Sequence, residues 1–311
     1  MNFTGGRRDT QAVLQFRCSA GWTSGIHGEF IYLSAFNIFL SITAVFGNTL
    51  ILVALRKVTS LHPPSKLLFR CLATTDICVG LITEPLNIVY SMSLTHGQWK
   101  LCRYAYASFF IVSYTLSSVS LLTISAISVD RLLALLLGLR YRQVVTLRRT
   151  YVIVAIFWVM SAIVSIFFLL NPLIPTWYGY LIIPSCLVTS IASYTKIFLK
   201  LRHRQTQVQR HVQQEQPGQP VPLNIDQYRK AVSSALWVQC TLVVCYLPYA
   251  ILRASVSYSK TFPSSVFLIG VAATLIFFNS SLNPILYCWK ISEVKQAVKE
   301  TIREALCCLS S

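Results

Sequence analysis

The sequence predicts an all-α membrane protein, built as a seven-transmembrane helix bundle. Two features of its composition favour this class. Of its 311 residues 54% are hydrophobic and only 12% are charged, whereas soluble domains carry about a quarter charged residues. The mean hydropathy is +0.58. The third observation is a series of long uncharged runs, because a helix needs about 20 apolar residues to cross the hydrocarbon core of a bilayer.

These runs give the positions of the spans. The uncharged or nearly uncharged runs are residues 30–55, 71–99, 104–129, 150–195, 231–252 and 261–289. The run 150–195 is long enough for two spans. We place the turn between them at Asn171, Pro172 and Pro175, because proline removes a helix donor and clashes with the preceding turn. The second run contains Asp76 and Glu84. We therefore expect seven crossings.

The distribution of lysine and arginine predicts the orientation. Most of these residues fall in the segments that are cytoplasmic if the N-terminus is outside, which is the usual bias of membrane proteins. We expect a multi-pass protein of the plasma membrane with a cytoplasmic C-terminus. The net charge of +17 does not indicate nucleic-acid binding, because the basic residues flank spans and do not form one domain. They should instead favour anionic lipids of the inner leaflet.

The segments outside the spans have distinct compositions. Residues 1–28 are polar, without the apolar core of a signal peptide, and are expected to be a short extracellular tail. Residues 203–227 are rich in Gln and Pro and predict a flexible cytoplasmic loop. Residues 291–311 predict an amphipathic helix on the membrane surface, followed by the cytoplasmic tail. Asn2 begins an N-glycosylation pattern, which can also arise by chance.

Polar residues inside the spans indicate function, because they are costly in lipid. Asp76 lies in mid-membrane, where desolvation drives a lone carboxylate to protonate. Five residues of the spans could be its partners: Asn48, Ser120, Asn279, Ser280 and Asn283. Asn279 and Asn283 share one helix face because they are four residues apart. Such oxygen donors suit a small hard cation, and a protonated Asp76 with water is the alternative.

Short motifs occur in order along the spans. They are Gly47-Asn48, LATTD at 72–76, DRL at 130–132, Trp158, Pro184, CYLP at 245–248 and NSSLNPILY at 279–287. The ordered set resembles the rhodopsin-like (class A) family of G-protein-coupled receptors over nearly all of residues 29–308, with residues 29–290 as the receptor domain. The resemblance implies a receptor that binds a small extracellular ligand within its helices and activates heterotrimeric G proteins. Arrestin is a further possible partner.

The resemblance also implies roles for single residues. Asp130 would hold Arg131 in the resting state, and Arg131 would turn to the G protein in the active state. Tyr287 and Tyr194 would take part in this switch. Alternatively, Asp130 and Arg131 are only a charged pair that extends to the membrane–water interface. Leu132 replaces the usual tyrosine. Many family members also have an acid near the base of the sixth helix that engages the arginine, whereas here Asp226 is followed by Tyr228, Arg229 and Lys230, so we expect basal signalling that is not low. The family's sodium pocket would match Asp76 and its partners; sodium is the only bound ion expected, and no cofactor. The activation hinge would comprise Tyr246, Pro248, Pro284 and Pro184.

The same resemblance narrows the ligand pocket. Ser113 stands where amine receptors of the family have an aspartate, and Phe277 where its opsins have a lysine, so neither a typical amine receptor nor an opsin is expected. The candidate pocket residues are Glu84, Phe109, Ser113, Tyr246, Tyr249, Arg253 and Phe277. Glu84 and Arg253 could each meet a ligand of opposite charge. Alternatively, they reach water or pair with each other.

The cysteines and the remaining alternatives complete the prediction. The second outer loop is short and lacks the cysteine that relatives pair with the third helix, so we suggest a Cys18–Cys102 disulfide, with two free thiols as the alternative. Cys307 and Cys308 are candidates for palmitoylation or remain unmodified.

The short loop and LRYRQVVTLRR are locally similar to the melanocortin-like and adenosine-like branch. A transporter or an enzyme is disfavoured, because no repeat, metal cluster or nucleophile–base pair stands out.

Overall fold

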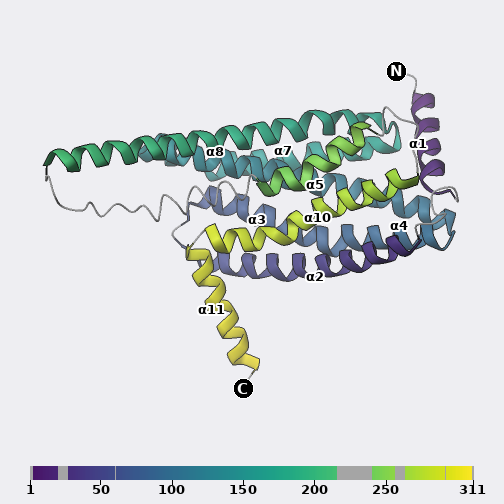
Figure 1. The fold of residues 1–311 in the computed structure, drawn as a ribbon, viewed down its shortest axis with the longest axis horizontal. Coiled ribbons are helices and arrows are strands. Elements are labelled where there is room, and N and C mark those ends of the chain that lie inside the picture. Colours follow the sequence, from purple (N-terminus) through teal and green to yellow (C-terminus); the bar gives the residue numbers. More distant parts are fainter. Residues whose placement is uncertain are drawn as a thin grey trace.

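The computed structural model describes residues 3–19, 27–59, 61–215, 240–255, 263–290 and 292–309. All regular structure within these ranges is helical. Six helical segments there are long and apolar enough to cross a membrane, and a shorter apolar helix, Cys240–Ser255, accounts for the remaining span. The long helices run side by side along one axis (Figure 1). The predicted seven-helix membrane bundle is confirmed, although residues 231–239 of the sixth span lie outside the described ranges.

Several spans consist of more than one element. In chain order the elements are α1 (Phe3–Arg17), α2 (His27–Lys57), α3 (Pro63–Cys78), the π-helical turn η2 (Val79–Thr83), α4 (Glu84–Thr95), α5 (Trp99–Leu137), the 3-10 turn η3 (Gly138–Arg140), α6 (Tyr141–Val144), α7 (Leu147–Ile166), the 3-10 turn η4 (Phe167–Leu169), α8 (Leu173–Glu215), the helix Cys240–Ser255, α10 (Pro263–Lys290) and α11 (Ser292–Leu309). Elements α3, η2 and α4 form one span, Pro63–Thr95.

Local sequence explains where these helices begin and end. Prolines occupy the first turn of α3, where the missing N–H would have no helical partner. The Thr146 side chain accepts a hydrogen bond from the Arg149 N–H at 3.5 Å and caps α7. Helix α5 ends at Gly138, whose φ of 51° is a conformation that side chains with a Cβ rarely adopt.

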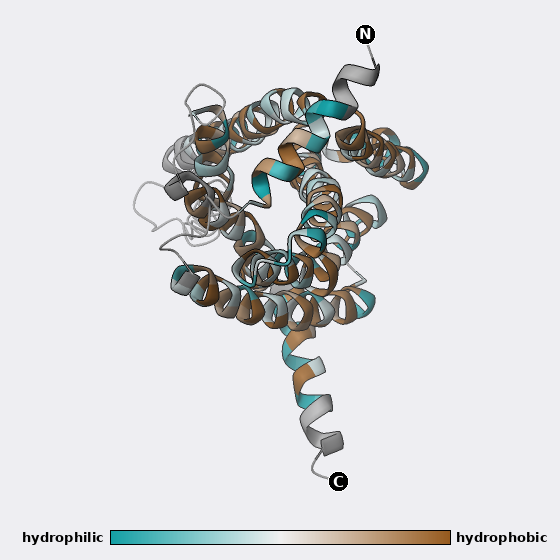
Figure 2. Ribbon diagram, turned by 90° about the vertical axis from the view of Figure 1, so that its right-hand side faces the viewer, coloured by the Kyte–Doolittle hydropathy of each residue, from teal (hydrophilic) through white to brown (hydrophobic). Residues whose placement is uncertain are grey.

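The side chains are distributed as a bilayer requires. Large apolar side chains face outward, including Phe46, which is 71% exposed. Polar side chains lie between the helices, and Asn48 and Asp76 are both completely buried. Figure 2 looks along the bundle and shows apolar residues on most of its helices. Lipid covers the outer faces, so the polar groups can find partners only inside the bundle.

Helices α2 and α10 approach one another closely at Gly47. A Cβ built at Gly47 would lie 2.9 Å from Cγ of Pro284. The absence of a side chain at Gly47 is therefore the feature that lets the two backbones pack at this height. Two sequence motifs, Gly47-Asn48 and the one that contains Pro284, thus meet in one contact.

Two segments outside the predicted spans contain helix. Residues 3–17 of the expected tail form α1, which lies across one end of the bundle, opposite the end from which α11 departs (Figure 1). The segment 203–227 was expected to be a loop, but α8 continues to Glu215 and extends past its neighbours. Residues 203–215 contain no Gly or Pro, so nothing in them interrupts the helix. Residues 216–227 lie outside the described ranges.

Candidate functional site

Polar side chains from α3, α5 and α6 gather near the end of α5 that leads to Gly138, and we call this group the inner network: Ser65, Asp130, Arg131 and Tyr141. A nitrogen of the Arg131 guanidinium donates to Oδ2 of Asp130 at 3.0 Å. The Arg131 guanidinium also lies over the ring of Phe69, 5.7 Å from its centroid. The Asp130 carboxylate is largely shielded from water at 4% exposure, whereas the Arg131 side chain is 29% exposed. The predicted pair is therefore formed.

The inner network contains two partners that sequence reasoning missed. The Tyr141 hydroxyl donates to Oδ1 of Asp130 at 2.6 Å, and the Ser65 hydroxyl donates to Oδ2 at 2.8 Å. Tyr141 belongs to the short helix α6, so its hydroxyl stands in for the phenol that Leu132 lacks. The only feature of the sequence that could have indicated this contact is Tyr141 itself, a single tyrosine among the basic residues that follow the third span.

The middle of the bundle holds the predicted central polar cluster: Asn48, Asp76, Ser120, Asn279, Ser280 and Asn283. The Asn283 amide donates to Oδ2 of Asp76 at 2.7 Å, and the Ser120 hydroxyl donates to Oδ1 at 3.4 Å. All six residues are at most 4% exposed. Oδ1 of Asn48 and Nδ2 of Asn279 have no partner among the described residues. A buried cluster with free donors and acceptors has capacity for an ion or water.

Asn48 also compensates for a proline. Pro284 has no N–H, so the carbonyl of Ser280, four residues earlier, loses its helical donor. The Asn48 amide donates to this carbonyl at 2.9 Å. In lipid every backbone polar group needs an internal partner, and Asn48 supplies one. This bond makes the α10 backbone at Ser280 depend on a side chain of α2.

The predicted hinge residues lie where proline interrupts the helices. Pro184 is inside α8, Pro284 inside α10 and Pro248 inside the helix Cys240–Ser255. Tyr246 is 2% exposed and lines a cavity in the outer half of the bundle. Tyr194 lines a small cavity of about 20 Å³ that also borders Asn279 and Asn283. The same cavity is lined by Phe69, over whose ring the Arg131 guanidinium lies, so it borders both the central polar cluster and the surroundings of Arg131.

The cavity in the half of the bundle nearer α1, which we call the outer cavity, has a volume of about 130 Å³ and is lined in part by Arg17 of α1. Six residues expected at a ligand pocket line it: Phe109, Ser113, Tyr246, Tyr249, Arg253 and Phe277. Aromatic rings form much of its wall. Phe109 stacks on Tyr90 with ring centroids 6.3 Å apart and meets Phe277 edge-on at 6.0 Å. A mostly apolar cavity with a few polar groups is typical of small-molecule sites.

Glu84 is a correction to the predicted pocket. It does not line the outer cavity; it is completely buried, and neither carboxyl oxygen has a hydrogen-bond partner within the described ranges. It therefore neither reaches water nor pairs with Arg253. The π-helical turn η2 ends directly before Glu84. The extra residue of this turn rotates α4 about the helix axis, which a regular helical count does not reveal.

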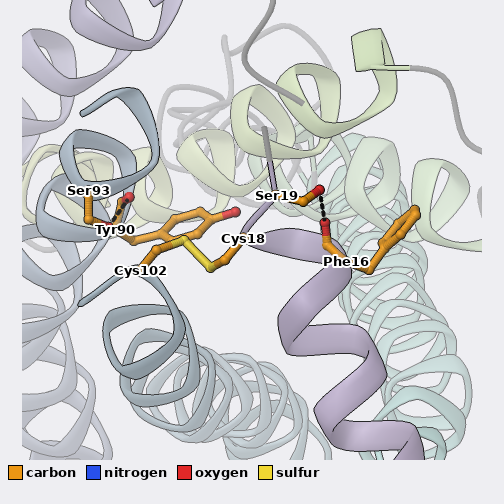
Figure 3. Close-up of a disulfide and its surroundings, with 6 residues drawn as sticks. All are labelled: Phe16, Cys18, Ser19, Tyr90, Ser93 and Cys102. Atoms are coloured by element: carbon orange, nitrogen blue, oxygen red, sulfur yellow. Dashed lines mark hydrogen bonds between the residues drawn. A yellow bond between two sulfur atoms is a disulfide. The ribbon is translucent and has the colours of Figure 1, made fainter. Parts of the chain in front are cut away.

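The N-terminal helix contributes to the outer cavity, which the sequence did not predict. Cys18 and Cys102 form a disulfide with Cα atoms 5.9 Å apart, which confirms the suggested pairing. Figure 3 shows this disulfide beside Tyr90 of α4. Arg17, the residue before Cys18, lines the outer cavity together with Tyr90. The cysteine pair was the only sequence signal that could have placed Arg17 there.

Some predicted sites lie beyond the residues that the structure describes. These are Asn2 and the side chains of Tyr287, Cys307 and Cys308. The glycosylation site, the Tyr287 switch and the palmitoylation sites remain predictions.

Comparison with known proteins assigns the family. Residues 47–173 and 173–287 match the profile of the 7 transmembrane receptor (rhodopsin family). The chain belongs to this family. The sheep adenosine receptor A3 is 25% identical over 88% of the chain and 90% of its own length. The human adenosine receptor A2a is 23% identical, over 89% of the chain and 73% of that receptor. The octopamine receptor beta-1R of Drosophila melanogaster is 22% identical, over 89% of the chain and 63% of that receptor.

Membership of the rhodopsin family makes the protein a multi-pass membrane receptor and not an enzyme. The resemblance read from the ordered motifs is confirmed, and the adenosine receptors agree with the local similarity to the adenosine-like branch. The inner network, the central polar cluster and the outer cavity are therefore three levels of one receptor domain.

Proposed function

We propose that the protein binds a small extracellular ligand in the outer cavity and in response activates heterotrimeric G proteins. The observation that carries this proposal is the alignment of the outer cavity, the central polar cluster and the inner network within one bundle. Tyr246 lines the outer cavity, and Asn279 and Asn283 border the small cavity of Tyr194. A ligand that prefers one arrangement of these helices enriches that arrangement.

At the cytoplasmic end, activation releases Arg131 from Asp130. In the resting state the guanidinium is held by the carboxylate and by the Phe69 ring. Outward movement of the helix Cys240–Ser255, hinged at Pro248, opens a cavity in which Arg131 contacts the G protein. Arrestin uses the same opened cavity. The N-terminus is extracellular, the C-terminus is cytoplasmic, and the basic inner segments contact anionic lipids of the plasma membrane.

The experiment measures coupling without a known ligand. Purified receptor in lipid nanodiscs is tested for binding of nucleotide-free Gα subunits from each class, and cells are tested for basal G-protein activation. Arg131→Gln should abolish both signals for the subunit that binds. Arg142→Gln is the matched control, because Arg142 lies nearby but is exposed. Absence of Gα binding in every class, or solute flux through the purified protein, would refute the proposal.

We further propose that the central polar cluster binds sodium as an allosteric modulator. Asp76 would supply the charge, and Asn48, Ser120, Asn279, Ser280 and Asn283 would supply neutral oxygens from their hydroxyl and amide groups. The free Oδ1 of Asn48 supports this fit. A single carboxylate with neutral oxygens suits a hard monovalent ion better than a transition metal. Sodium here would stabilise the resting arrangement of the helices.

The relatives are named for ligands of different chemistry, adenosine and octopamine. Ser113 argues against a typical amine. Its hydroxyl lines the outer cavity and donates to the Phe110 carbonyl at 3.2 Å. A hydroxyl is neutral, so this position offers no negative charge to pair with an ammonium group.

A further inference from the structure

We infer that the outer cavity binds an organic anion: a carboxylate or phosphate on a compact apolar body, with its acidic group held by Arg17 and Arg253. This inference rests on the proposed function, which it narrows to a ligand class. It follows from the charges that line the cavity, from the way Arg17 is fixed there and from a buried hydroxyl in the pocket beside Arg253 that has no partner in the described ranges.

The charge of the outer cavity is one-sided. Among the described residues, its lining includes Arg17 and Arg253 but no Asp or Glu. The two ion pairs found within the described ranges use neither arginine. Three acidic residues come from the segments at this end of the bundle, and none of them lines the cavity: Asp9 and Glu29 are exposed, and Glu84 is buried elsewhere. Two guanidinium groups at an apolar cavity without a protein counter-ion favour an anion from outside.

Arg17 is held in place by covalent and polar contacts. The disulfide of Cys18 ties the end of α1 to α5. Closer to the start of α1, the Thr10 hydroxyl donates to the Phe168 carbonyl at 3.0 Å. Arg17 is only 9% exposed. Helix α1 thus contributes a fixed, largely buried cation to the outer cavity, and an anchored group loses little entropy when it binds a ligand.

Arg253 lies at the junction between the outer cavity and a side pocket of about 40 Å³. Its only hydrogen bond within the described ranges is a long one, 3.4 Å to the Thr176 hydroxyl. The Tyr180 hydroxyl lines the same side pocket, is buried and has no partner in the part of the chain described. Arg253 has five N–H donors and Tyr180 has one O–H donor, so the two residues can serve several oxygens of an acidic group.

The remaining wall selects the body of the ligand. Tyr90 and Phe109 stack with their planes only 5° apart, and Phe110 stacks on Tyr114 with centroids 5.6 Å apart. Such rings pack well against a flat or compact apolar group. An amine of the same shape would bring a third positive charge beside the two arginines, and an amide would leave both of them unpaired.

The experiment uses ligand sets that share one body and differ in charge. Purified full-length receptor in phosphatidylcholine nanodiscs, without anionic lipid, is titrated with phenylacetate, 2-naphthylacetate and phenyl phosphate. The amide of each carboxylic acid, phenol and phenethylamine serve as neutral and cationic counterparts. We expect at least one anion to raise the Tm saturably at millimolar concentration while its counterparts do not. The carboxylate and phosphate arms distinguish the two kinds of acidic group.

Variants assign the effect to the two arginines. Arg17→Gln and Arg253→Gln should each weaken anion binding about tenfold or more, because a hydrogen bond to a charged group contributes at least that much. Arg253→Lys should retain preference for the anion, and Arg253→Glu should prefer the amine. Arg103→Gln is the matched control, since Arg103 is near the outer end of α5 but does not line the cavity.

The outcomes separate this inference from the proposed function. Binding of amides or amines as tight as that of the anions, anion binding unchanged in both glutamine variants, or no anion binding would overturn it. The proposed function would stand in each case if the same nanodiscs bind a Gα subunit. Retained Gα binding also shows that each variant is folded, so a loss of anion binding cannot be attributed to unfolding.

Discussion

The hydroxyl of Tyr141 donates a hydrogen bond to Oδ1 of Asp130 at 2.6 Å, while the Arg131 guanidinium holds Oδ2 of the same carboxylate at 3.0 Å. Tyr141 therefore fixes the carboxylate that restrains Arg131, and it does so from the loop after the third span. The sequence predicted a weak restraint because Leu132 is not a tyrosine. The contact from α6 replaces that missing group.

We predict that Tyr141→Phe raises basal G-protein activation severalfold. The substitution removes only a hydroxyl, but a hydrogen bond to a charged group contributes roughly 1.5–3 kcal/mol. Basal activation should be measured in cells and normalised to receptor at the surface. Tyr151→Phe is the control, because Tyr151 is 56% exposed on α7. An unchanged basal level in Tyr141→Phe would show that Ser65 and Arg131 hold Asp130 without it.

Sodium should stabilise the purified receptor against heat, and Asp76→Asn should remove this effect. A ligand that binds only the folded state stabilises it by about 2.7 kcal/mol at 100 times its Kd. The Tm is compared in sodium chloride and in choline chloride of equal ionic strength, so that general screening cancels. Equal stabilisation of wild type and Asp76→Asn by sodium would exclude Asp76 as the ion's ligand.

Loss of the disulfide should destabilise the outer half of the bundle. Cys18 and Cys102 are 84 residues apart in sequence, and removing a native disulfide typically costs about 2–5 kcal/mol. Cys18→Ser and Cys102→Ser should lower the Tm equally, and the double variant should add nothing. Cys240→Ser, at an exposed free cysteine, is the control. Additive effects of the two single variants would contradict a shared bond.

Gly47→Ala should lower the Tm by several degrees. The added Cβ would lie 2.9 Å from the Pro284 ring, which cannot rotate away, and overpacking of this kind costs about 1–3 kcal/mol. Gly28→Ala is the matched control, because a Cβ there would meet nothing within 4 Å. If both variants keep the wild-type Tm, α2 and α10 do not approach each other closely at Gly47.

The site was only partly predictable from sequence. Span positions and the motif residues follow from composition and order, and the Cys18–Cys102 pair was suggested by the missing cysteine in the second outer loop. Glu84 was misplaced because its position within a span does not show which way its side chain faces after the π-helical turn η2. Arg17 was missed because the polar composition of the tail does not predict that it packs over the end of a bundle, and only the pairing of the neighbouring Cys18 pointed there. The helical extension of α8 to Glu215 was missed because a Gln-rich composition was taken for a loop.

The sequence by itself determined that the chain crosses a membrane as seven helices and that Asp76, Asp130 and Arg131 lie within or at the edge of them. The reason is that lipid excludes charge. Uncharged runs therefore mark the spans, and the few charged residues within them can be recognised directly in the sequence. Only the tertiary structure decided that Tyr141 serves Asp130 and that Arg17 and Arg253 meet at one cavity. These groups come from separate segments, and their contacts depend on how the helices pack.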